Sequence, residues 1–294
     1  MQQIRIINTY PDFLEFWEKY QNRPITIQVE KWASEYMAKW PELLEMQISD
    51  YTNQHIAWQQ IASEKVFPFL SSRLSSMHEA QQNITDTFIP ICYQAFKKLG
   101  FETNIVCIIY VGIGCGAGWA TKYTGEPAII FGLENIAECN WSDQQSIAGL
   151  SAHEIGHIVH AVWRSQSNKP DEDGPWWQLF TEGFAQRCEH LILGKETWYE
   201  AGNSDENWLI WCRENKSYLA SEFLSYIYEG KDALPFFGSW FSIDGHSQCG
   251  YFLGHEVIKD LQLQGMSLKD IGTLAHPEQN LNKILRGYLK TQPI

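Results

Sequence analysis

The stretch His153-Glu154-Ile155-Gly156-His157 decides how the rest of this chain can be interpreted. It lies in a segment with helical periodicity. Two histidines four residues apart lie one above the other on a helix, about 40° apart around its axis. Both rings can therefore reach one metal ion. Glu154 projects close by and can take a proton from a water held by that ion without being a ligand itself.

The surrounding residues predict that this helix covers 142–164. Ser142 can cap its start, with Gln145 as the capping-box partner three residues later. A stripe of apolar residues follows at helical spacing: Ile147, Leu150, Ile155, Ile158, Val159 and Val162. The two histidines flank the stripe, so we expect a helix that is buried on one side and offers its ligands at the edge of the core. The alternative is a core helix with two hydrogen-bonded histidines.

A third ligand is needed if zinc is to keep one position for water. The segment Trp176–Leu193 has a helical pattern and contains Thr181-Glu182-Gly183-Phe184-Ala185. The connection of about a dozen residues lets the two helices pack antiparallel, with Glu182 facing His153 and His157. An ordinary surface carboxylate is the alternative, but a charge among aromatic residues requires a partner. The sequence therefore predicts one Zn²⁺ held by His153, His157 and Glu182.

These residues resemble a known group of enzymes. The order H-E-x-x-H and then Glu182 within Thr181–Gln186 (TEGFAQ) is similar to the gluzincin zinc peptidases, which include thermolysin and the alanyl aminopeptidases. The chain also resembles bacterial proteins described as predicted zinc-dependent proteases. The resemblance covers roughly residues 104–260 and implies a zincin-like fold, the three ligands above, and Glu154 as general base.

Two positions depart from that group. Gln186 stands where thermolysin has an aspartate behind its zinc ligands. The segment Gly132-Leu133-Glu134-Asn135 is similar to the amine-binding motif of the aminopeptidases, but it is one residue short and lies closer to the metal helix. Glu134 is thus a candidate for binding a free amino terminus, and the choice between endopeptidase and aminopeptidase stays open.

An acyl-transfer site also needs a donor for the developing oxyanion. Tyr251 and His255 are four residues apart near the start of a later helix and share one of its faces. The resemblance favours Tyr251 as this donor, with His255 or His246 as alternatives. Tyr251 could also be a packed aromatic residue. His160 lies close to His157 on its helix, and we expect it to support the site or the core rather than to bind the metal.

The rest of the pattern predicts an α+β fold that is mainly helical. We expect a helical region over 1–100, in which 4–7 form a short strand, 11–21 form a helix, and Pro41 and Pro68 interrupt the helices up to Gly100. Residues 101–294 would form the zincin-like catalytic domain, with a small sheet packed on the metal-binding helix and a helical C-terminal lobe. The last segment, 267–289, has the pattern of two short helices.

The sheet is expected from two apolar stretches, 104–111 and 127–133. Between them, Gly112-Ile113-Gly114-Cys115-Gly116-Ala117 has the spacing of a dinucleotide-binding loop. Such a loop opens a helix, whereas Gly125-Glu126-Pro127 predicts a turn almost at once. A hairpin or irregular edge of the sheet is therefore the preferred interpretation.

Composition limits the partners. The 294-residue chain has a net charge of −13, which disfavours nucleic acid and anionic membranes. Seven scattered cysteines without C-x-x-C disfavour a disulfide framework and fit a reducing compartment. No signal peptide or membrane span is visible. We therefore expect a cytoplasmic protein that hydrolyses peptide bonds in a peptide or protein substrate. A non-catalytic zinc-binding interaction protein and a zinc hydrolase of a non-peptide substrate remain alternatives, and the oligomeric state is not predicted.

Overall fold

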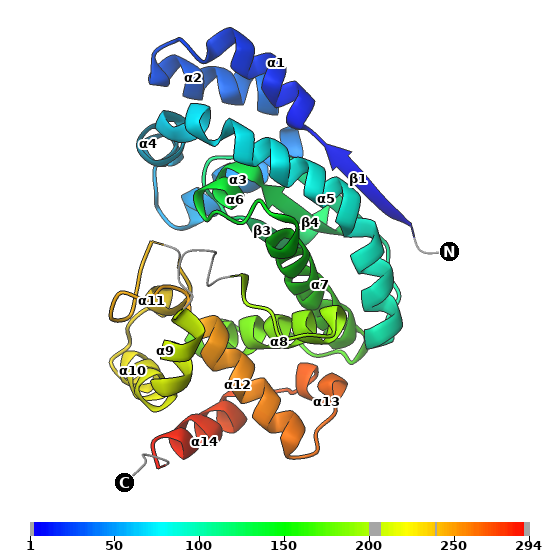
Figure 1. Cartoon of the computed structure of the whole chain (residues 1–294), viewed down its shortest axis with the longest axis vertical. Helices are drawn as coiled ribbons and strands as arrows, with labels where there is room; N and C mark the ends of the chain where they lie inside the picture. The colour runs from blue at the N-terminus through cyan, green and yellow to red at the C-terminus, as the bar shows by residue number, and fades with distance from the viewer. Residues whose placement is uncertain (1–2, 200–206, 239, 291–294) are drawn as a thin grey trace. The chain divides into compact units, whose positions relative to one another are not determined.

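Most of the chain is helical, and four strands near its middle and its start form a small mixed sheet (Figure 1). The computed structural model describes residues 3–199, 207–238 and 240–290. The chain divides into two compact units. Unit 1 comprises Met1–Tyr93 and Glu102–Ser151, and unit 2 comprises Gln94–Phe101 and Ala152–Ile294. The expected α+β class is confirmed at this level.

Unit 1 contains β1 (Ile4–Asn8), α1 (Tyr10–Tyr20), α2 (Ile25–Lys31), α3 (Pro41–Asn53), α4 (Trp58–Ile61), β2 (Ile105–Tyr110), β3 (Gly118–Tyr123), β4 (Glu126–Gly132), α6 (Leu133–Glu138), most of α5 (Leu70–Leu99) and the start of α7 (Gln144–Gln166). Short π-type and 3₁₀ turns lie at Trp32–Tyr36, Met37–Lys39, Ala62–Val66 and Phe67–Phe69. Unit 2 contains the rest of α7, α8 (Pro175–Leu193), α9 (Trp208–Glu214), α10 (Lys216–Tyr228), α11 (Leu234–Phe237), α12 (Cys249–Leu263), α13 (Leu268–Gly272) and α14 (Glu278–Tyr288).

Several expected elements are confirmed. The first strand, the helix that follows it and the two short C-terminal helices lie where the pattern placed them. Pro41 is the first residue of α3, and Pro68 lies in a 3₁₀ turn before α5. Gly100 follows the last residue of α5 with a φ of +67°, a conformation that glycine adopts without steric cost. The expected division after residue 100 groups these elements differently, since β1 pairs with β2 inside unit 1.

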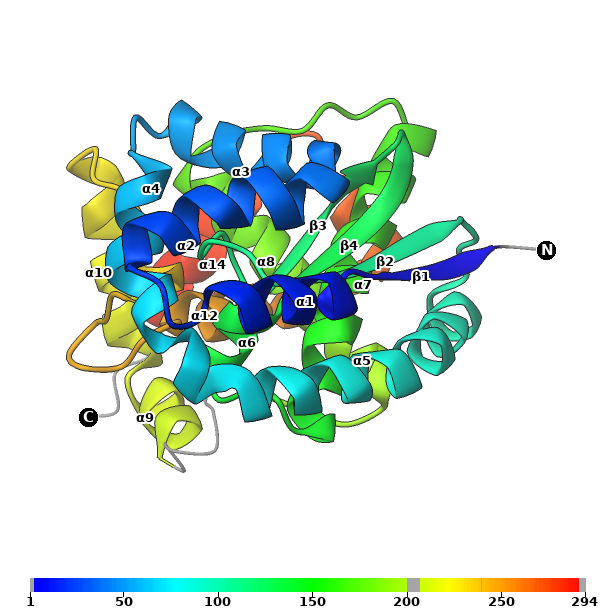
Figure 2. The same cartoon turned by 90° about the horizontal axis from the view of Figure 1, so that it is seen from above.

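The sheet has the strand order β1-β2-β4-β3 (Figure 2). β2 is parallel to β1 on one side and to β4 on the other, and all six of its residues are buried. A central parallel strand that is covered on both faces needs a continuous apolar run, and β2 has the sequence Ile-Val-Cys-Ile-Ile-Tyr. Both expected strands, 104–111 and 127–133, are therefore present as β2 and β4.

The expected hairpin between these two strands is wrong. β4 runs parallel to β2, and the hairpin is formed by β4 with β3, which the sequence analysis did not identify. Its two-residue turn is Thr124-Gly125, with φ values of +50° and +82°. This pair of positive values matches the tight turns that suit the twist of antiparallel strands. The glycine-rich segment after β2 leads into β3 and not into a helix, so a dinucleotide loop is not formed there.

Glu134 holds the glycine-rich segment in place. Its Oε2 accepts a hydrogen bond from the Gly112 N–H (2.7 Å) and its Oε1 accepts one from the Gly114 N–H (3.2 Å). A Cβ atom on Gly112 would lie 2.7 Å from the same carboxylate, so a larger residue there would force the Glu134 side chain to shift. The side chain is fully buried. Its oxygens are therefore committed to the chain's own backbone, and we assign it this structural role in place of binding an amino terminus.

Burial should make this carboxyl group a source of pH-dependent stability. Burial raises the pKa of Glu134 from 4.5 to about 7, and the two backbone donors offset only part of this. The native state therefore holds the proton more tightly than the unfolded chain, and this stabilisation is lost as the pH rises from about 4.5 to about 7. At about 1.4 kcal/mol per pH unit, the total is about 3 kcal/mol.

Glu134→Gln should remove this dependence, because the amide does not titrate. We expect the free energy of unfolding of the wild type, measured by urea titration, to fall by about 2–3 kcal/mol more than that of the variant between pH 5 and pH 8. Parallel pH profiles for the two proteins would contradict the assignment.

No helix in the described part of the chain combines the length and the apolar character that crossing a bilayer requires.

Candidate metal centre

The residue that caps the start of α7, the helix with the two histidines, lies one position later than expected. Asp143, and not Ser142, accepts hydrogen bonds from the N–H groups of Gln145 (2.9 Å) and Ser146 (3.1 Å). An aspartate at this position accepts hydrogen bonds from backbone N–H groups that have no partner within the helix. Its negative charge also interacts favourably with the positive end of the helix dipole. The predicted capping-box role of Ser142 is therefore wrong, because the hydroxyl of Ser142 instead bonds Glu79. The predicted apolar stripe is buried, apart from partly exposed Val162.

Small residues let the helices of unit 2 approach each other closely. A Cβ atom on Gly156 would lie 2.8 Å from the Cα of Ala185, so the backbones of α7 and α8 are in contact there. A Cβ atom on Gly183 would lie 2.2 Å from the carbonyl carbon of Gly254, so α8 and α12 also meet backbone to backbone (Figure 1). Gly156 lies inside the H-E-x-x-H stretch, and Gly183 directly follows Glu182. The close approaches therefore occur at the residues that position the site.

His153, His157 and Glu182 converge as the sequence predicted. Glu182 Oε2 lies 3.1 Å from His153 Nε2 and 3.3 Å from His157 Nε2, and the two Nε2 atoms are 3.2 Å apart. Each residue offers one ligand atom, and the three atoms form a group that could hold a metal ion. Among the described residues, this is the one such group of histidines, cysteines and carboxylates.

The spacing of the three atoms fits a small tetrahedral ion. With metal–ligand bonds of about 2.0–2.1 Å, two ligand atoms of a tetrahedral zinc lie about 3.3 Å apart. The observed separations of 3.1–3.3 Å are close to that edge length. Two imidazole nitrogens and one carboxylate oxygen are also ligands that zinc accepts, with a fourth position left for water. The residues present therefore fit zinc.

The charges of the group are strongly coupled. Burial opposes charge on His157, but the Glu182 carboxylate outweighs it and raises the pKa of His157 to about 9. Burial likewise opposes charge on Glu182, but His157 and His153 hold its pKa well below the usual value. Glu182 is thus kept ionised, which is the state that binds a metal. The two histidines therefore keep Glu182 charged although only about a fifth of its side chain is exposed to solvent.

His153 is supported from behind by a polar network on α8. Its Nδ1 lies 3.2 Å from Gln186 Oε1, and the amide of Gln186 donates from Nε2 to the carbonyl oxygen of Thr197 (3.1 Å). Because that donation fixes the amide, its oxygen faces the ring. Nδ1 then carries the hydrogen, and Nε2 is left as the ligand atom. Gln186 thus supplies a neutral acceptor to His153 Nδ1.

Glu189 is a member of this network that the sequence analysis missed. It is fully buried, its Oε1 accepts a hydrogen bond from the Thr197 hydroxyl (2.5 Å), and its Oε2 lies 4.0 Å from His153 Nδ1. A signal for it did exist. Glu182, Gln186 and Glu189 follow one another at i, i+4 and i+7, so they share one face of α8.

Glu154 is buried beside the group without being one of its three members. Its charge contributes to the raised pKa of His157, which places the carboxylate within electrostatic reach of the ligands. The side chain is 6 % exposed, so it lies at the edge of the protein interior rather than in open water. A base beside a metal-held water needs this combination of proximity and limited solvation.

Of the candidate oxyanion donors, Tyr251 lies beside the group. Its ring centroid is 5.6 Å from that of His153, and the ring of Phe237 also packs edge-on against Tyr251, with centroids 5.6 Å apart. His255 is instead buried among aromatic rings, 4.5 Å from His190 and 5.1 Å from Trp198 between centroids. His246 stacks on Trp211 at 4.1 Å. The geometry therefore favours Tyr251 over the two histidines.

His160 is a structural residue. Its Nε2 is 2.9 Å from the carbonyl oxygen of Gly272, and its ring packs on Phe184 with centroids 4.7 Å apart. Burial and the nearby Arg164 lower its pKa to about 3, so the ring stays neutral. It is not part of the metal group, as the sequence analysis expected.

Comparisons of the chain with known protein families, with curated proteins and with solved structures found no match.

Removing a ligand should remove the metal. We expect the wild type, purified without chelator, to retain about one zinc ion per chain, and His157→Ala or Glu182→Ala to lower zinc affinity by at least about a hundredfold. His160→Gln is the matched control on the same helix and should keep the metal. Zinc content by mass spectrometry and competition with a chromophoric chelator measure both. Equal zinc content in the two ligand variants and the wild type would contradict the site.

Proposed function

We propose that this protein is a zinc-dependent peptidase of the gluzincin type. The observation that carries the proposal is the convergence of His153, His157 and Glu182, whose ligand atoms are spaced like three corners of a tetrahedron, with Glu154 buried nearby. A structural zinc site is closed by four protein ligands, whereas three ligands leave a position for water. A buried carboxylate next to that position supplies the base that hydrolysis needs.

The proposed mechanism assigns one role to each side chain. Zinc, when bound, lowers the pKa of a water molecule and polarises a carbonyl group. Glu154 takes the proton from the attacking water and delivers it to the leaving amine. The Tyr251 hydroxyl donates a hydrogen bond to the carbonyl oxygen as negative charge develops there. Gln186 holds His153 in the tautomer that offers Nε2 to the metal.

We assign the helix pair α7 and α8 to a zincin-like core that binds one Zn²⁺, and we place the protein in the cytoplasm with a peptide or protein as substrate. Glu154 argues against a zinc-binding protein without activity, because such a site has no use for a buried base next to the ligands. Esters share the reaction chemistry of peptides, so the experiments below include both kinds of substrate.

Glu154→Gln should abolish hydrolysis without removing zinc. The amide keeps the size of the side chain but cannot accept the proton, so we expect kcat on a peptide library to fall by about 10²–10⁴-fold. Glu214→Gln, an exposed change in the same unit, is the matched control. Zinc-loaded wild type that cleaves an ester but no peptide would replace the peptidase with another hydrolase, and loss of neither activity in Glu154→Gln would exclude Glu154 as the base.

Tyr251→Phe separates the oxyanion role from packing. It keeps the ring beside His153 and removes only the hydroxyl, so we expect kcat to fall by about 10²-fold with KM little changed. His255→Gln provides the comparison and should alter kcat much less. A larger loss of kcat in His255→Gln, in a protein that keeps its zinc and its stability, would move the oxyanion role to His255.

A further inference from the structure

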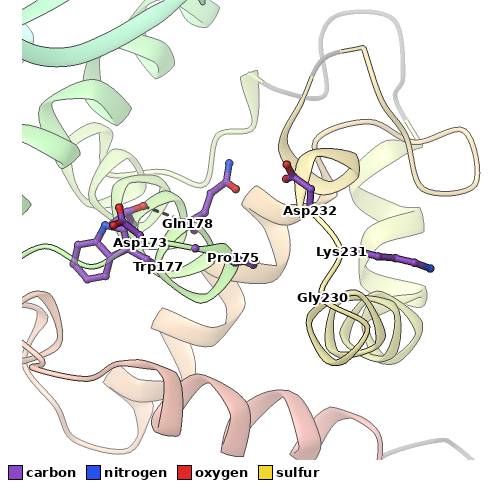
Figure 3. Close-up of a pocket in the computed structure, with 9 residues that line it drawn as sticks. Asp173, Pro175, Trp177, Gln178, Gly230, Lys231 and Asp232 are labelled. Carbon is purple, nitrogen blue, oxygen red and sulfur yellow. Dashed lines mark hydrogen bonds between the residues drawn. The ribbon is translucent and has the colours of Figure 1, made fainter. Parts of the chain in front are cut away.

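A cavity of about 560 Å³ opens in unit 2 beside α8 (Figure 3). We call it the α8 pocket. Trp177, Gln178 and Thr181 line it from the first turns of α8, and Asp173 lines it from the segment before α8. Lys231 and Asp232 line it from the segment between α10 and α11. Pockets of this volume accommodate a side chain or a small ligand.

Both walls of the pocket are connected with residues of the candidate site. Thr181 immediately precedes Glu182, and Gln178 lies one helical turn before it on the same face of α8. On the other side, Asp232 stands just before α11, whose last residue Phe237 packs on Tyr251 at 5.6 Å. Tyr251 in turn lies 5.6 Å from His153. Along α8, one wall of the pocket therefore lies within one helical turn of Glu182, and a chain of ring contacts connects α11, next to the other wall, with His153.

The distance along α8 suits a peptide side chain near the cleaved bond. One helical turn separates Gln178 from Glu182, which is about 6 Å along the helix. An extended peptide advances about 3.3 Å per residue, with successive side chains on opposite sides. A peptide bond held at the metal would thus bring the side chain of a residue one or two positions away to the pocket.

The pocket is negatively charged. Asp173 and Asp232 are its acidic residues, and Lys231 is the one basic residue among those that line it. The Lys231 ammonium is directed elsewhere: its Nζ is 2.5 Å from Glu229 Oε2 and lies over the Tyr226 ring, and Figure 3 shows it pointing away from the pocket. The lining therefore contributes two carboxylates and no ammonium group directed toward the cavity.

Both carboxylates also have a simpler explanation. Asp232 Oδ1 accepts the Leu234 N–H at the start of α11, and Asp173 stands just before α8, where negative charge favours the helix dipole. Asparagine serves equally well as a helix cap. An Asp→Asn change therefore keeps the capping and removes the charge, which separates the two roles.

We propose that the α8 pocket binds a cationic side chain, arginine or lysine, of the peptide substrate, within two residues of the bond that is cleaved. Gln178 and Thr181 add polar atoms to the two carboxylates, a set that suits a guanidinium or ammonium group. This inference rests on the proposed function, because it places the pocket relative to a peptide held at the metal.

The test measures binding separately from cleavage. Blocked hexapeptides that differ only by arginine or citrulline at one position are titrated, by fluorescence anisotropy, into zinc-loaded Glu154→Gln protein. We expect arginine at one position to bind about tenfold more tightly than citrulline, and Asp232→Asn or Asp173→Asn to reduce that preference by at least about threefold. Glu214→Gln, an exposed loss of one negative charge elsewhere in the same unit, is the matched control and should leave the preference unchanged.

The outcomes distinguish the pocket from the proposed activity. Equal binding of arginine and citrulline peptides at every position, or a preference that neither aspartate variant reduces, overturns the inference. If the wild type cleaves these peptides without any preference for arginine, the peptidase stands and the pocket assignment fails. If it cleaves none of them but the arginine preference depends on Asp232, the pocket assignment stands as a binding site and the peptidase fails.

Discussion

The metal group depends on how closely three helices approach one another. α7 and α8 touch at Gly156 and Ala185, and α8 and α12 touch at Gly183 and Gly254. Any side chain at these glycines would push the backbones apart, and the side chains of His153 and Glu182 could then no longer meet within 3.1 Å. The same α8–α12 contact brings Tyr251 to the ring of His153. The ligand set and its neighbours are therefore consequences of helix packing, since each ligand is supplied by a rigid element and not by a loop.

Once the helices are packed, charge and burial determine the state of each group. Glu182 stays ionised because two imidazoles face it, whereas His160, a short distance along α7, is kept neutral by burial and Arg164. On the same helix, the pKa of His157 is raised and the pKa of His160 is lowered, so the two histidines have opposite tendencies to bind a proton. Their surroundings differ in one respect above all: His157 faces a carboxylate, and His160 faces a backbone carbonyl and aromatic rings. Only the first environment is suited to a divalent cation.

The metal group could be predicted from the sequence because local spacing determines where its residues lie. The spacing of His153 and His157 places them on one helix face, and a short connection to α8 restricts where Glu182 can lie. The prediction failed where pairing between distant segments determines the structure. The parallel pairing of β2 with β4, and the insertion of β3 at the edge, depend on contacts that no local pattern encodes. Ser142 and Asp143 are both suitable caps, and the sequence pattern did not distinguish between them. The support of His153 by Gln186 and Thr197 depends on where the chain runs after α8, which the local pattern does not contain.

The carboxylate of Glu134 also explains why a phosphate-loop pattern can mislead. Backbone N–H groups of Gly112 and Gly114 converge on its two oxygens, in the way that such a loop would surround a nucleotide phosphate. The chain thus provides its own carboxyl group, covalently attached, as the acceptor for these amides. A free phosphate would have to displace it before reaching the same donors. Glycine spacing alone does not reveal whether a nest of amides is vacant or already filled from within.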